Sequence, residues 1–312
     1  MIVKFSGGAI AGASERRHNL GKIEAVRHKV AKTVGTRPRH RTGAGRGEDG
    51  VAVLSRLAGA FVRAVLVMVL IAIPSVMLPG TSADTKQMVA LVALFAGALT
   101  FAEYAATYPS IVDFRDAAPY NRTRFVLLFV IVFFLSVAAR NMAEPSNIGA
   151  LFEALAFVFG RALDFPYSPV RLVTLMLPED APRALELALR SAAGTAYMLV
   201  LMVLTAFVAI LRIYNWPGSN GAFNVWINLP TFDPTAGGDV VARLERDARI
   251  NLALGFVLPF LIPAMVKFGG VDLGTFDLGS SQSMIWMVAA WAFLPATLVM
   301  RGIAMGRIAG MI

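Results

Sequence analysis

The chain of 312 residues contains no cysteine and only three histidines, His18, His28 and His40. The absence of cysteine excludes disulfide bonds, iron–sulfur clusters, thiol catalysis and a lipidated cysteine. All three histidines lie within the first 40 residues, so the rest of the chain cannot hold a His-ligated haem or metal ion. We therefore predict no metal site and no cofactor.

Charged residues are also scarce, at 16% of the chain, whereas hydrophobic residues make up 57% and the mean hydropathy is +0.64. A soluble domain has nearer a quarter charged residues and less than half apolar ones. This excess of apolar residues predicts an integral membrane protein. The net charge of +9 comes almost entirely from the N-terminal tail, and it is no argument for nucleic-acid binding.

Six stretches are long and apolar enough to cross a bilayer as helices, which takes about 20 residues each. We predict an all-α transmembrane bundle with spans at roughly Leu57–Leu78, Gln87–Tyr108, Arg124–Met142, Ala192–Tyr214, Asn251–Phe268 and Met284–Ile303. A seventh stretch, residues 147–165, is apolar for a shorter length and contains Glu153 and Arg161. It could be interfacial, re-entrant or a further span.

The distribution of basic residues predicts the orientation of the bundle. With the N-terminus in the cytoplasm, 21 Lys and Arg residues fall on the inner side and 7 on the outer side. Such an excess inside is the usual bias of membrane proteins. Arginine outnumbers lysine 23 to 6, which is typical of a GC-rich bacterial genome. We therefore expect a multi-pass protein of the bacterial inner membrane with both termini in the cytoplasm.

Two regions are expected to lie outside the bilayer. Residues 1–50 form a basic tail, in which 14–34 have the spacing of an amphipathic helix and 36–50 the composition of a flexible linker. Such a helix can bind anionic lipid head groups or a partner, or the tail can simply enforce topology. Residues 143–190, cut into short helices by prolines, are expected to cap the outer ends of the spans.

Arg63 and Glu103 are the charges that lie deepest within the predicted spans. Each lies five or six residues from the cytoplasmic end of its helix, roughly 8 Å below the same surface. Equal depth on consecutive antiparallel helices predicts an ion pair between them, which could be a structural link or part of a transport pathway. In the alternative, the Arg63 side chain extends to the lipid head groups.

Prolines and glycines mark two further features of the spans. Pro259 and Pro263 lie on one face of the fifth span and predict a kink or hinge, of the kind that also exposes carbonyls to ions in transporters. Gly302, Gly306 and Gly310 form a GxxxGxxxG run at the end of the sixth span, which predicts close helix packing. The partner could be this chain, a second copy or another membrane protein.

The sequence contains no phosphate-binding loop, no dinucleotide-binding GxGxxG, no HExxH and no GxSxG motif. We therefore assign no catalytic residue and favour a non-catalytic membrane subunit, scaffold or assembly factor. The first alternative is a small transporter or channel that uses Arg63, Glu103 and the proline-broken helix. The second is a lipid-acting enzyme that uses the polar loop 109–124.

Overall fold

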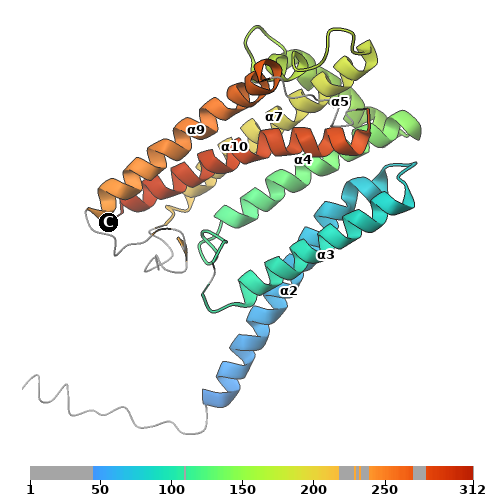
Figure 1. Ribbon diagram of the computed structural model, residues 1–312. Coiled ribbons are helices and arrows are strands. Elements are labelled where there is room, and N and C mark those ends of the chain that lie inside the picture. Colours follow the sequence, from blue (N-terminus) through green and yellow to red (C-terminus); the bar gives the residue numbers. More distant parts are fainter. Residues whose placement is uncertain are drawn as a thin grey trace, which may run out of the picture. The chain divides into compact units, whose positions relative to one another are not determined.

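A computed structural model describes residues 45–108, 110–217, 228–229, 232, 239–269 and 279–311. These residues form eight helices and no strand, which confirms the predicted all-helical fold (Figure 1). The helices are α2 (Gly45–Met77), α3 (Ala83–Ala105), α4 (Tyr120–Ala143), α5 (Asn147–Leu163), α6 (Pro169–Thr174), α7 (Arg183–Ile213), α9 (Val240–Phe268) and α10 (Ser281–Ala309). The predictions for the tail up to residue 44 lie outside the described residues.

Six of these helices are long and apolar enough to cross a membrane: α2 from Val53, α3, α4, α7, α9 and α10. They coincide with the six predicted spans, so this is a multi-pass membrane protein. The chain divides into two compact units, residues 1–54 and 55–312. Only the beginning of α2 is described in the first unit.

Helix α10 forms the centre of the bundle. It packs against α4, α7 and α9, and these four helices run side by side in Figure 1. Its small residues allow this central position, because alanines and a glycine line much of its buried surface. One core cluster surrounds α10 near the turn 78–82, and a second surrounds it near the loop 106–119. We refer to these as the 78–82 end and the 106–119 end of the bundle.

Several helix boundaries differ from the predicted ones. Residues 183–190, expected in the outer cap, are the first turns of the continuous helix α7. Helix α2 begins at Gly45, inside the stretch predicted to be a linker. Helix α9 begins at Val240 and continues into the fifth span, and its capping residue Asp239 accepts a hydrogen bond from the Val241 amide.

The short apolar stretch 147–165 forms α5, which packs against α4 and α7. Glycines make the contact with α7 possible. A Cβ atom on Gly194 would lie 2.5 Å from the Cα of Gly160, so neither position has room for a side chain. The sequence analysis did not identify these two glycines, although Gly194 lies within a run of small residues.

Candidate functional site

Glu103 binds the loop that follows its own helix. Its carboxylate accepts hydrogen bonds from the backbone amides of Ser110, Ile111 and Val112, at 3.0, 3.0 and 3.2 Å, and from the Ser110 hydroxyl at 2.5 Å. A carboxylate is well suited to this role, because it offers two oxygens and about four acceptor positions. Glu103 therefore holds the start of the loop against the end of α3.

Arg63 does not reach Glu103. Its guanidinium donates to the Gly59 carbonyl at 2.7 Å and lies 4.7 Å from the centre of the Tyr104 ring. Within the described part of the chain, the two residues form no ion pair with each other, and the structure differs here from the predicted pairing. The physical reason is that the loop amides occupy the carboxylate, while Arg63 turns back toward the start of its own helix.

Arg115 complements Glu103 at the same helix end. Its guanidinium donates to the carbonyls of Glu103, Ala106 and Thr107, at 3.2, 2.6 and 3.3 Å. The last carbonyls of a helix have no partner within it, and a cation there also interacts favourably with the helix dipole. The loop amides thus donate to Glu103 of α3, and Arg115 of the loop donates to carbonyls at and just beyond the end of α3.

The middle of the loop is anchored in the second core cluster. The Phe114 side chain is fully buried, and its ring centre lies 4.4 Å from that of Tyr120 and 6.1 Å from that of Trp216. The Phe114 amide donates to the Asn228 carbonyl at 2.6 Å. These contacts fix the middle of the loop in place, although its sequence is rich in polar residues.

Asp113 links the loop to the central helix through a 3.1 Å ion pair with Arg301. Burial raises the pKa of the Asp113 carboxyl above its ordinary value, and the nearby Arg301 and Arg124 offset this only in part. Asp116, in contrast, is exposed and pairs with the adjacent Arg115. The acids of this loop therefore point to separate partners rather than to one head group.

Two acids near the 78–82 end also connect separate segments. Glu153 of α5 accepts a 2.7 Å hydrogen bond from the Asn141 amide of α4. Asp164 pairs with Arg171 of α6 at 2.7 Å and with Arg190 of α7 at 3.5 Å. Arg161 lies over the Phe157 ring. The Glu153 and Arg161 side chains nevertheless stay exposed, whereas the Asp164 side chain is enclosed by its neighbours.

The proline pair of the fifth span lies inside an uninterrupted helix. Pro263 has no amide proton, so the carbonyl of Pro259, four residues earlier, lacks its usual helical partner. The indole nitrogen of Trp291 on α10 donates to this carbonyl at 3.1 Å, in a buried position. The freed carbonyl is thus paired within the chain.

The three glycines of the sixth span differ in their surroundings. A Cβ on Gly302 would lie 2.8 Å from the Ala248 carbonyl oxygen and 3.0 Å from the Leu252 amide nitrogen, so backbone packs directly on backbone. At Gly306 the nearest atom is the Ala248 Cβ at 3.8 Å, and Gly310 ends the helix. The packing partner is therefore α9 of the same chain, and Gly302 is the position that requires glycine.

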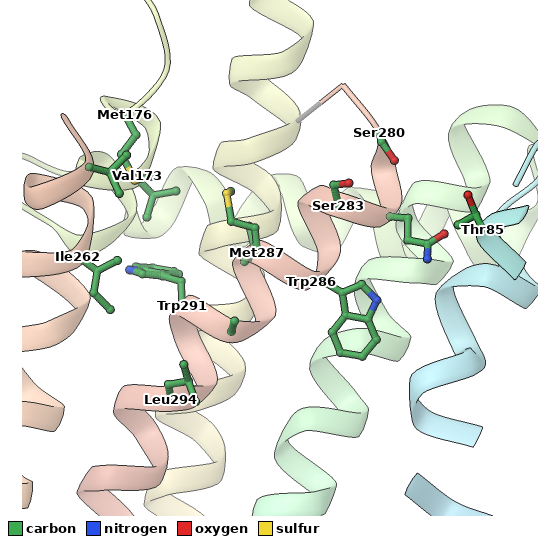
Figure 2. A pocket seen from close by; sticks show the side chains of 14 residues that line it. Thr85, Val173, Met176, Ile262, Ser280, Ser283, Trp286, Met287, Trp291 and Leu294 are labelled. Carbon is green, nitrogen blue, oxygen red and sulfur yellow. The ribbon is translucent and has the colours of Figure 1, made fainter. Parts of the chain in front are cut away.

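A cavity of about 800 Å³ lies along one face of α10, toward the 78–82 end. Its wall is mainly apolar, and Trp286, Met287 and Trp291 come from α10 and Ile262 from α9. Figure 2 shows the polar groups Ser280, Ser283 and Thr85 toward one end, and Trp291, Leu294 and Ile262 toward the other. This cavity was not predictable from the sequence, since its walls come from helices distant along the chain.

Comparison of the chain with protein-family models, with curated proteins and with solved structures finds no match. Within the described residues, no group of three or more His, Cys, Asp or Glu side chains could hold a metal ion. The functional argument therefore rests on the geometry of the chain itself.

Proposed function

We propose that this protein is a non-catalytic subunit, scaffold or assembly factor of a membrane complex. The observation that carries the proposal is that four acids of the bundle form structural links between separate segments. Glu103 and Asp113 hold the loop 106–119 to α3 and α10, while Glu153 and Asp164 connect α5, or the segment after it, to neighbouring helices. Groups with fixed partners support a rigid framework better than they support proton or ion transfer.

The proposal places the protein in the inner membrane of a bacterium, with both termini in the cytoplasm. The excess of basic residues on the N-terminal side supports this orientation. The basic tail would then lie along the inner leaflet, where anionic lipid head groups or a partner protein can bind it.

The outward-facing surface of α3 is the candidate partner surface. Its exposed side chains are large and apolar, among them Leu91 and Phe95, which are 70% and 72% exposed. In a bilayer, such a surface contacts lipid tails, a helix of a partner protein or a second copy of the chain. The proposal assigns it to a membrane-protein partner.

A small transporter is the second candidate, and the cavity along α10 is the observation that favours it. A transporter would have to open this cavity alternately to the two sides of the membrane. The lipid-acting enzyme receives less support, because Asp113 and Asp116 are engaged with different partners.

Site-specific photo-crosslinking in cells tests the proposal. A photoreactive phenylalanine analogue at Phe95 is expected to give one discrete protein adduct, whereas the same analogue at the buried Phe207 gives none. The crosslinked partner should also co-purify in mild detergent at a fixed ratio and decrease in amount when this protein is deleted. If Phe95 gives lipid adducts alone and the protein, purified alone, drives solute uptake into vesicles, the transporter reading replaces the proposal.

A further inference from the structure

The cavity along α10 adjoins a second, polar pocket. This pocket has a volume of about 350 Å³ and lies at the 78–82 end, between the turn 78–82 and the start of α10. Thr85, Ser280 and Gln282 line both spaces. The apolar cavity and the polar pocket are therefore adjacent and share part of their walls.

The wall of the polar pocket offers uncharged hydrogen-bonding groups. The hydroxyl groups of Thr81 and Ser82 lie on one side, where they already bond the Leu78 carbonyl and Thr85. Those of Ser280 and Ser281 lie on the other side, beside the Gln282 amide, which bonds the Ser75 hydroxyl. No charged side chain is among the described residues that line it. The pocket therefore matches a polar group that carries hydroxyls and no net charge.

The apolar cavity follows a regular stripe of α10. Its α10 positions include Ser283, Met287, Ala290 and Leu294, which recur at three- and four-residue spacing and so share one helix face. The cavity runs from the polar pocket along this face, in the direction of the bundle axis (Figure 2). Its volume of about 800 Å³ lies within the roughly 300–1,000 Å³ typical of small-molecule sites.

The junction between the two spaces is held in place. The Gln282 amide donates to the Ser75 hydroxyl of α2 at 3.0 Å, so α10 and α2 are tied together beside the polar pocket. At the other side of the cavity, the Trp291 ring is fixed by its hydrogen bond to the Pro259 carbonyl. Both walls are thus set by contacts within the chain, and the space is preformed.

We propose that the two spaces form one binding site for a glycerolipid with an uncharged, hydroxyl-bearing head group. One acyl chain lies in the apolar cavity along α10, and the glycerol hydroxyls bind the polar pocket. The polar pocket of this site lies at the 78–82 end of the bundle. The inference goes beyond the proposed function and does not depend on it, because a subunit and a transporter could both hold such a lipid.

Photolabelling in phosphatidylcholine nanodiscs tests the site. The probe is monooleoylglycerol that carries a diazirine in its acyl chain, and labelled residues are mapped by mass spectrometry. We expect the label on residues 286–294 and on Ile262 or Val266. Unlabelled monooleoylglycerol should abolish the labelling, whereas oleate, which has the same chain and a charged head, should compete at least tenfold less well.

Two matched substitutions separate the site from general lipid contact. Ala290→Trp fills the cavity from an exposed position on α10, and Ala253→Trp adds the same ring at an exposed position on α9 away from it. We expect A290W to reduce labelling of the cavity at least tenfold, and A253W to leave it within twofold of the unmodified protein. Ala290→Val should give an intermediate reduction, which keeps the test valid if A290W folds poorly.

Ser281→Ala tests the polar pocket and should lessen the preference for monooleoylglycerol over oleate at least threefold. Three results would overturn the proposal. These are labelling that A290W leaves unchanged, labelling spread evenly over the exposed faces of α3 and α9, and a protein adduct from a crosslinker at position 290 in cells. The last result would assign the cavity to a helix of a partner protein.

Discussion

Replacing Trp291 with phenylalanine removes one buried hydrogen bond while keeping an aromatic ring in place. The Trp291 ring is 7% exposed and stacks on Tyr197, with ring centres 5.9 Å apart. Phenylalanine can keep this stacking, but it has no donor for the Pro259 carbonyl. That carbonyl would then have no hydrogen-bonding partner in an apolar part of the bundle.

The expected cost follows from the buried carbonyl and the smaller ring. Leaving a buried backbone acceptor without a partner costs about 1–3 kcal/mol. The lost ring volume adds roughly 1 kcal/mol if the neighbouring side chains relax only in part. We therefore expect Trp291→Phe to lower the free energy of unfolding by about 2–4 kcal/mol.

A second substitution isolates the hydrogen bond from the loss of volume. Pro263→Ala restores an amide at the position that normally bonds the Pro259 carbonyl, so the carbonyl keeps a partner without Trp291. In the Pro263→Ala background, Trp291→Phe should cost only the volume contribution. The double-mutant cycle should then give a coupling free energy of about 1–3 kcal/mol between the two positions.

Reversible unfolding in mixed detergent micelles, followed by circular dichroism, measures these differences. Trp286→Phe is the matched control, since Trp286 is only half-buried beside the cavity and has no comparable role. It should cost less than about 1 kcal/mol. A coupling free energy near zero would refute the reasoning, because it would mean that the carbonyl of Pro259 gains nothing from either donor.

Three further predictions concern other contacts of the bundle. Glu103→Ala should lower stability by at least about 2 kcal/mol and speed amide exchange at residues 110–112, because it removes the acceptor of those amides. Gly302→Ala should destabilise the protein by about 1–3 kcal/mol, since its Cβ meets the backbone of α9, whereas Gly306→Ala should be neutral or stabilise it by up to about 1 kcal/mol. Asp113 has a raised pKa when folded, so the folded state takes up its proton first as the pH falls. Lowering the pH from neutral toward 4 should therefore raise the melting temperature of the unmodified protein relative to that of Asp113→Asn.

The control for Glu103→Ala is Glu144→Ala, which removes an exposed ion pair with Arg140 and should change stability by less than about 1 kcal/mol. Equal effects of Gly302→Ala and Gly306→Ala would show that α9 and α10 do not approach as closely as described. A pH dependence that Asp113→Asn leaves unaltered would assign the titration to another group.

The membrane architecture was predictable because it depends on local composition. A span needs a continuous apolar stretch, and all six spans could be located from that property alone, although α7 and α9 begin nine and eleven residues before the predicted starts at Ala192 and Asn251. The side chains of Ser146 and Asp239 accept hydrogen bonds at the starts of α5 and α9, which is a local signal of the same kind. Residues 183–190 were predicted to lie outside the fourth span because several prolines interrupt that segment. In the structure, Pro182 is the last residue before a continuous helix.

The site residues were harder to predict because their partners are distant in sequence or in a loop. Glu103 was predicted as a charge deep within its span, but the donors to its carboxylate follow it by seven to nine residues, in a loop that folds back. No helix-surface spacing encodes that return. The packing glycines are also only partly predictable. The repeat of Gly302 and Gly306 is visible in the sequence, but the position of α9 decides which of the two requires glycine.

The proline pair shows why such patterns allow two opposite interpretations. A carbonyl freed by proline inside a membrane must find another partner, because lipid tails offer none. In a transporter the partner can be an ion, and here it is an indole 32 residues further along the chain. In both cases the sequence indicates the carbonyl that proline leaves unpaired, but it does not indicate which group or ion binds it. It is therefore the hydrogen bond from Trp291 to this carbonyl, and not the presence of the two prolines, that favours a static framework for this protein.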